Sequence, residues 1–169
     1  MNQRFIFILF AACLAASALT AGDKMNFSGD WAFSETKSTL DEMGTRFIPT
    51  VMKLTQQDND LVIQRTYQRE YEDDFVLEES VTLDGEECHS EFWNSPRVST
   101  ANWSEKGDTL IIDTKITFER EGQTSEMNIR EAWSLKEEGK MLTIEHFSSS
   151  DWGEREIIMV FDKKEAQPE

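Results

Sequence analysis

The sequence contains few of the residues that build cross-links and metal centres. It has two cysteines, two histidines and three prolines in 169 residues. Cys13 lies in a leader that we expect to be removed, so Cys88 would be left alone and no intrachain disulfide could form. Cys88 and His89 are adjacent, and adjacent side chains in a strand point to opposite faces, so they cannot both bind one ion. We therefore expect no metal site, no cofactor and no nucleophilic triad.

Clusters of lysine and arginine are also absent. The chain has 33 acidic and 17 basic residues, a formal charge of −16, and loss of Arg4 with the leader would take the charge to −17. Such a charge repels nucleic acid and anionic membranes, because phosphate binding depends on clustered basic side chains. The acidic residues are spread along the chain, which favours a role in solubility over an acidic binding tail.

No apolar run reaches the roughly 20 residues that a membrane-spanning helix needs. The longest run, Phe5 to Ala16, follows Arg4 and precedes small residues, which is typical of a secretion signal over residues 1–21. Cys13 raises the alternative of a lipid-anchored protein, but Phe10 stands where such a site has an aliphatic residue. We therefore expect an exported protein, periplasmic or extracellular, without a stable membrane span.

Residues 22–169 suffice for a single domain, and their pattern indicates hairpins of β-strands. Alternate residues from Leu110 to Phe118 are apolar or threonine, as in a half-buried strand. Turn residues that accept a positive φ recur at Asp58-Asn59-Asp60, Asp84-Gly85, Lys106-Gly107-Asp108, Glu121-Gly122 and Glu138-Gly139-Lys140. The unequal spacing of these turns favours a meander over a solenoid.

About ten strands are predicted from these turns. They are Trp31 to Ser34, Thr50 to Gln56, Leu61 to Gln68, Phe75 to Leu83, Cys88 to Trp93, Val98 to Ser104, Thr109 to Glu119, Ser125 to Leu135, Leu142 to Ser149 and Glu154 to Phe161. So many strands leave exposed edges unless the sheet closes, so we expect an all-β, antiparallel up-and-down barrel of about 8–10 strands. The segment Glu35 to Phe47 breaks the pattern and could be a connecting loop or a lid over the barrel mouth.

A short motif at the first strand, Gly29-Asp30-Trp31, resembles the Gly-x-Trp signature of the lipocalin and fatty-acid-binding superfamily. Further segments resemble secreted bacterial lipocalin-like proteins: Phe27 to Trp31, Leu83 to Glu86, Glu131 to Leu135 and Val160 to Lys163. The resemblance implies that Trp31 closes the narrow end of a barrel over 22–169 and that an arginine, here Arg155, packs across it. Gly29, Trp31 and Arg155 would then be structural.

Several polar residues share a strand face with apolar neighbours. They are Arg65, Glu79, Glu131 and His146. If these faces point inward, the barrel interior holds an arginine, a histidine and two carboxylates, and Arg65 could receive a ligand carboxylate. The alternatives are that Arg65 pairs with Glu79 or Glu131 and binds nothing, or that a bulge turns a side chain outward.

The leading hypothesis is a binding protein for a small hydrophobic or amphipathic molecule. The expected ligand-binding residues are Arg65, Tyr67, Glu79, Phe118, Glu131, Trp133 and His146, with Phe147 as a further aromatic lining residue. One alternative is a filled barrel that acts through its surface, as an interaction or structural protein of the cell envelope. A third, an isomerase or cyclase with Glu79 and Glu131 as acid and base, is less favoured, so we expect no enzyme.

Overall fold

The computed structural model describes residues 25–69, 73–120 and 122–165. The secretion signal predicted for residues 1–21 lies outside these ranges. The described residues form ten strands: β1 (Gly29–Phe33), β2 (Val51–Gln57), β3 (Asp60–Tyr67), β4 (Phe75–Thr82), β5 (Cys88–Phe92), β6 (Ser95–Trp103), β7 (Leu110–Arg120), β8 (Gln123–Lys136), β9 (Met141–Ser150) and β10 (Gly153–Lys163). No helix in the described ranges is long and apolar enough to cross a membrane.

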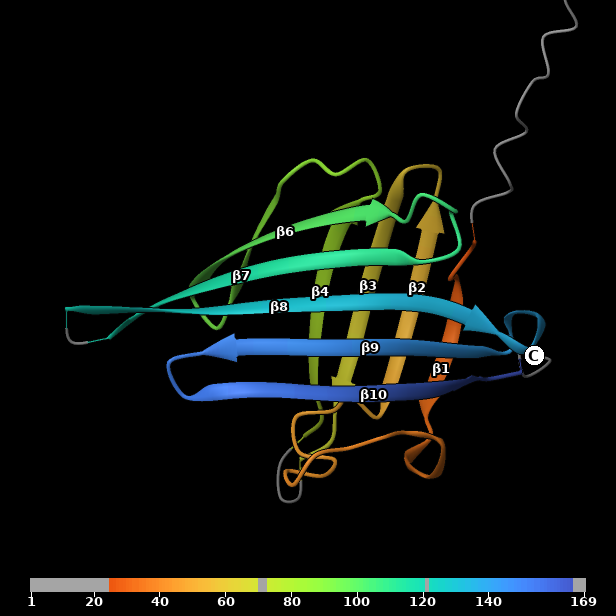
Figure 1. The fold of residues 1–169 in the computed structure, drawn as a ribbon, viewed down its shortest axis with the longest axis horizontal. Helices are drawn as coiled ribbons and strands as arrows, with labels where there is room; N and C mark the ends of the chain where they lie inside the picture. Colours follow the sequence, from red (N-terminus) through yellow and green to blue (C-terminus); the bar gives the residue numbers. More distant parts are fainter. Residues whose placement is uncertain (1–24, 70–72, 121, 166–169) are drawn as a thin grey trace, which may run out of the picture.

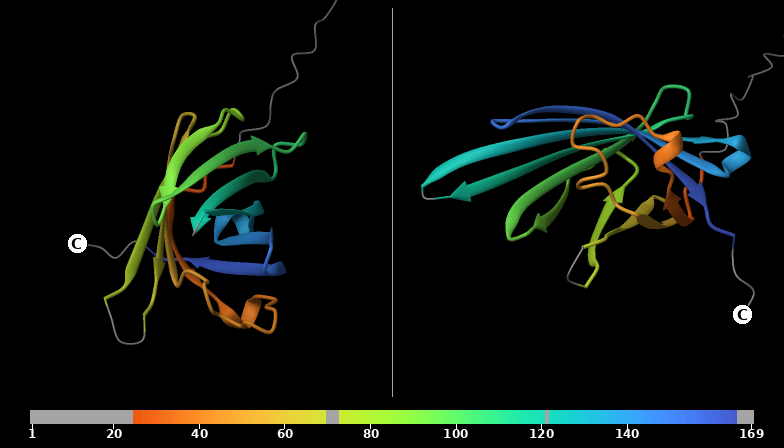
Figure 2. Two further views of the ribbon diagram at one scale, coloured as in Figure 1. Left: turned by 90° about the vertical axis from the view of Figure 1, so that its left-hand side faces the viewer. Right: turned by 90° about the horizontal axis from the view of Figure 1, so that it is seen from below.

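The ten strands form one antiparallel sheet in the order β4-β3-β2-β1-β10-β9-β8-β7-β6-β5. Figure 1 shows β1 to β4 crossing behind β6 to β10 at a steep angle, and the views of Figure 2 show the two layers facing each other. β1 pairs with β10, which joins the first and last strands, while β4 and β5 are the two ends of the ladder. The fold is a nearly closed antiparallel barrel, as the hairpin pattern predicts.

Each strand begins and ends close to its predicted position because turn residues separate the strands. Positive φ angles occur at Asp58, Gly85 and Gly107, and again around Glu138. One tight turn was not predicted: Trp93 and Asn94 join β5 to β6 with φ angles of 47° and 62°. Tryptophan rarely adopts this conformation, so the composition of this turn does not reveal it.

One end of the barrel is filled by its own side chains. Phe27, Trp31 and Trp133 are fully buried there, and the Phe27 ring packs edge-on against Trp133. The Trp31 indole donates a hydrogen bond to the carbonyl of Phe27 at 3.0 Å. Gly29 has a φ of 144°, and a Cβ atom there would lie 2.7 Å from the Lys163 side chain. Trp31 and Gly29 are therefore structural at the closed end.

The expected packing of Arg155 across Trp31 is wrong. Trp31 pairs in register with Lys163, whose ammonium group lies 5.2 Å from the indole centroid. Arg155 lies near the other end of β10, where its guanidinium pairs with Asp41 at 3.0 Å. The register between β1 and β10 decides this, because it places the C-terminal end of β10 against Trp31.

The segment between β1 and β2 has little regular structure. It begins with the short 3-10 helix η1 (Glu35–Lys37) and continues through turns to Pro49. Arg155 holds this segment through Asp41 and through the carbonyls of Gly44 and Arg46, both at 3.2 Å. Residues 35–47 therefore form an irregular loop, which was one of the two alternatives. Arg155 holds this loop near the cavity described below, on which the lid alternative depended.

Candidate functional site

A cavity of about 1290 Å³ occupies the barrel beyond the closed end. Its apolar wall comes from strands on both layers and includes Met52, Leu77, Ile116, Met127, Ile144 and Ile157. The volume exceeds what a small ligand needs, since ligand pockets commonly measure about 300–1,000 Å³. An open cavity contradicts a barrel filled entirely by its own side chains.

Five ionisable side chains from different strands meet beside the cavity, and we call them the charged cluster: Arg65, Glu79, Arg97, Glu131 and His146. Arg65 binds both carboxylates, contacting Glu79 through Nη1 and Glu131 through Nη2, the latter at 2.6 Å. Arg97 forms an ion pair with the second oxygen of Glu79. His146 Nδ1 lies 3.2 Å from Glu131 Oε1. The cluster is thus one connected chain of ion pairs.

The cluster lies between the apolar core and the cavity. Along β3, Leu61 and Ile63 are fully buried in the core, whereas Arg65 and Tyr67 line the cavity. The register between β3 and β4 continues without a bulge from Asp60 to Tyr67, so these side chains keep the inward face that the alternation predicts.

Opposite charges keep Arg65 and Glu131 ionised despite burial. Burial alone would raise the pKa of the Glu131 carboxyl, but the guanidinium of Arg65 and the hydrogen bond from His146 hold it at about 2. Burial alone would lower the pKa of Arg65, but Glu131 and Glu79 raise it overall. Burial lowers the pKa of Arg97 and raises the pKa of Tyr67. At neutral pH the interior therefore holds the ion pair of Arg65 and Glu131 beside an uncharged phenol.

One polar group at the cavity keeps unused hydrogen-bonding capacity. The Nε of Arg97 is buried and has no hydrogen-bond partner among the described residues. Buried polar groups are normally satisfied, so this atom is a place to which a bound molecule could present an acceptor. The Tyr67 hydroxyl also borders the cavity, and burial raises its pKa.

Aromatic side chains surround the open end of the cavity. Phe47, Trp93 and Trp152 all line it, yet each is more than 60% exposed to solvent. Trp93 packs on Phe75 with centroids 5.6 Å apart, and Trp152 meets Phe118 edge-on at 5.9 Å. The mouth is therefore an apolar rim that the described residues leave uncovered.

The predicted site residues fall into two groups. Arg65, Tyr67, Phe118, Glu131 and His146 line the cavity, as expected of ligand-binding positions. Glu79 and Trp133 do not line it but support residues that do. Glu79 pairs with Arg65, and the Trp133 indole donates to Glu131 at 3.0 Å. The ion pairing that the alternative expected for Arg65 is present, and it involves both carboxylates.

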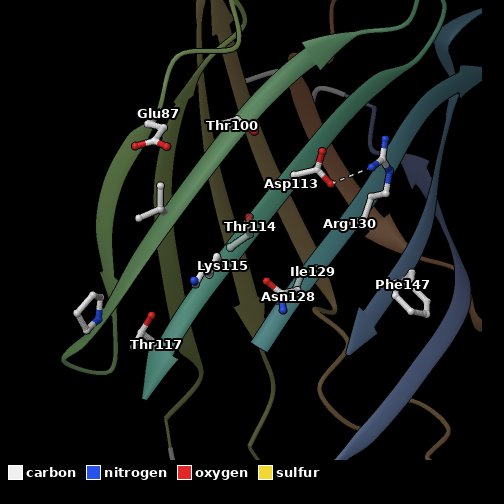
Figure 3. Close-up of a pocket in the computed structure, with 12 residues that line it drawn as sticks. Glu87, Thr100, Asp113, Thr114, Lys115, Thr117, Asn128, Ile129, Arg130 and Phe147 are labelled. Atoms are coloured by element: carbon white, nitrogen blue, oxygen red, sulfur yellow. Dashed lines mark ion pairs between the residues drawn. The ribbon is translucent and has the colours of Figure 1, made fainter. Parts of the chain in front are cut away.

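Phe147 is not part of the lining, contrary to the prediction. It pairs in register with Arg130, and both lie on the outer face of the sheet. Figure 3 shows this face, a shallow hollow over β6 to β9 in which Arg130 reaches Asp113 at 3.4 Å. Alternation along β9 explains the error, because Phe147 follows the inward-facing His146 and must face the other way.

Arg97 is the main site residue that the sequence analysis missed. The predicted strand began at Val98, whereas β6 begins at Ser95 and carries Arg97 inward together with Ser99 and Ala101. The missed Trp93-Asn94 turn explains the late start. The sequence did contain a signal for the inward position of Arg97. It was the alternation of Arg97, Ser99 and Ala101 with Val98 and Thr100.

The chain is similar in structure to the zebrafish ileal bile acid-binding protein complexed with cholic acid. The TM-score is 0.53 at 14% sequence identity, over 82% of this chain and 98% of the zebrafish chain. No protein-family model and no curated protein matches the sequence. At this identity the similarity shows a shared fold alone, an antiparallel β-barrel.

Proposed function

We propose that this protein binds a small hydrophobic or amphipathic molecule in its barrel. The observation that carries the proposal is the cavity itself: about 1290 Å³, apolar over most of its wall, with one buried charged cluster on one side. An apolar wall supplies affinity, and a few fixed polar groups orient the ligand. The shared fold with a protein that holds cholic acid is consistent with this use of the barrel.

Binding is a better account of the site than catalysis. A general acid or base works best with a pKa near the working pH. Arg65 keeps the pKa of Glu131 at about 2, far from that range, and Glu79 is tied to two arginines. The two carboxylates are thus arranged to hold the arginines in place.

The experiment compares two neighbouring serines on β9. Ser148 lines the cavity, whereas Ser149 pairs with Asn128 and shares the outer face with Phe147. We expect Ser148→Trp to weaken binding of the uncharged dye Nile red at least about tenfold, because the indole fills ligand space. Ser149→Trp, the matched control, should change binding less than about twofold. Far-UV circular dichroism verifies that both variants are folded.

Failure of the wild-type protein to bind the dye, or an equal effect of both substitutions, would contradict a binding cavity. Native mass spectrometry of protein purified from its own source provides an independent test. A retained small molecule supports the proposal, and a consistently empty, ligand-insensitive protein counts against it.

We also propose that the barrel works outside the cytoplasm, on the basis of the apolar run and small residues within residues 1–21. The N-terminal residue of the protein purified from its source tests this. A chain that begins near residue 22 supports export. A cell-retained chain that still begins at Met1 contradicts it.

A further inference from the structure

We infer that the ligand is uncharged, with a hydroxyl or carbonyl group at its polar end, and that a carboxylate is selected against. This inference rests on the proposed function and specifies its ligand. It departs from the sequence-based hypothesis in which Arg65 receives a ligand carboxylate, because the structure shows both buried arginines already occupied.

The first step is the charge balance of the cavity. Arg65 and Arg97 contribute two positive charges, and Glu79 and Glu131 contribute two negative charges that pair with them directly. These four residues are each at most 8% exposed. A ligand carboxylate would therefore add a third buried anion, which must displace a glutamate or go unpaired. Both alternatives are costly in a site shielded from water.

The second step is the set of hydrogen-bonding positions that remain open. The Nε of Arg97 is a buried donor without a hydrogen-bond partner in the described ranges. The Tyr67 hydroxyl can both donate and accept. When His146 donates from Nδ1 to Glu131, its Nε2 is an acceptor in the neutral ring. Mixed donors and acceptors suit a hydroxyl, which both donates and accepts. A carbonyl only accepts, as a carboxylate does, but it can use the open donors without bringing a charge into the site.

The third step concerns the charges near the mouth. Arg46 and Arg69 line the cavity, as do Glu35 and Glu154, so these four charges also balance among the residues that the structure describes. Arg155, which also lines the cavity, is paired with Asp41. Neither end of the cavity therefore provides an excess of positive charge for an anionic ligand. The full chain carries a formal net charge of −16, which repels anions further.

The test compares two probes with the same alkyl chain, 1-dodecanol and dodecanoate, by isothermal titration calorimetry at pH 7.5. We expect the wild-type protein to bind dodecanol at least about tenfold more tightly, because only the carboxylate brings an unpaired charge into the site. Equal or tighter binding of dodecanoate would overturn the inference while leaving the proposed function intact. Binding of neither probe would count against the proposed function itself.

A second comparison makes the charge argument specific. Glu131→Gln removes one buried anion and should raise the affinity for dodecanoate relative to that for dodecanol about tenfold. Glu78→Gln is the matched control, because Glu78 lies on the outer face of β4 and binds Gln64 at 2.6 Å. An unchanged ratio of the two affinities in Glu131→Gln would overturn the inference. If this variant does not fold, Glu79→Gln replaces it. In either case, the ratio of the dodecanol and dodecanoate affinities of the wild-type protein decides whether the inference holds.

Discussion

At the scale of single residues, buried charge is the dominant feature of this protein. Arg65, Glu79, Arg97 and Glu131 each lie almost wholly out of water, a position that ionised side chains tolerate only when they are paired. Pairing offsets the free energy that these charges lose when they leave water. It adds little net stability, since well-packed apolar residues at such positions often stabilise a fold equally well. We therefore attribute the cluster to ligand orientation and selection.

The paired state of Glu131 predicts how stability depends on pH. Its pKa of about 2 is below that of an unfolded glutamate, about 4.3, so its contribution is complete above pH 5 and is lost as the pH falls toward 2. The loss should be on the order of 3 kcal/mol, from roughly 1.4 kcal/mol per pKa unit. Urea unfolding between pH 7 and pH 2.5 measures it.

The control for this prediction lies on the same strand. Glu126 is an exposed residue of β8 that pairs with Lys115. The free energy of unfolding of Glu131→Gln should approach that of the wild-type protein as the pH falls, whereas Glu126→Gln should stay parallel to wild type at every pH. A difference between Glu131→Gln and wild type that is the same at pH 7 and pH 2.5 would contradict the assignment.

At the scale of elements, one arginine fixes the longest irregular connection. Arg155, on β10, donates to Asp41 and to the carbonyls of Gly44 and Arg46. These contacts hold a segment without regular structure beside the cavity, where Met43, Thr45 and Phe47 reach the lining. The side chain that was expected to pack across Trp31 thus positions the loop near the mouth.

Removal of this arginine should loosen the loop without unfolding the barrel. We expect Arg155→Gln to speed amide hydrogen exchange in residues 41–47 at least about tenfold, because the loop loses its main tertiary hydrogen bonds. Lys37→Gln, which removes an exposed ion pair with Asp162, is the control. Exchange rates in 41–47 that are the same in both variants would show that Arg155 does not hold the loop.

At the scale of the whole molecule, the sheet closes without a complete hydrogen-bonded ladder. β4 and β5 are the two ends of the strand order. Across this break the ion pair between Arg97 on β6 and Glu79 on β4 joins the two sides from the inside. A side-chain ion pair therefore helps to close the barrel at this break, whereas backbone hydrogen bonds join neighbouring strands elsewhere in the barrel.

This closure predicts where the barrel opens first. Arg97→Met should speed amide exchange most in β4 and β5, the strands at the break, because each then has a less restrained edge. Arg130→Met removes an ion pair with Asp113 on the outer face and serves as the control. A uniform increase across all ten strands in Arg97→Met would indicate general destabilisation instead.

The sequence by itself determined the strands and their faces. Turn residues with positive φ and a period of two are local properties, so ten antiparallel strands and the inward positions of Arg65, Glu79, Glu131 and His146 could be predicted. The Trp93-Asn94 turn and Arg97 were missed, because tryptophan gives no turn signal.

Only the tertiary structure decided which inward residues meet and what they leave open. The pairing of Arg65 with two carboxylates and the partly unsatisfied Arg97 depend on strands 14 to 66 residues apart in the chain. The register between β1 and β10 likewise placed Lys163, and not Arg155, over Trp31. Periodicity indicates which face a side chain occupies. Register and the crossing of the two layers determine its partner, and those are properties of the assembled sheet.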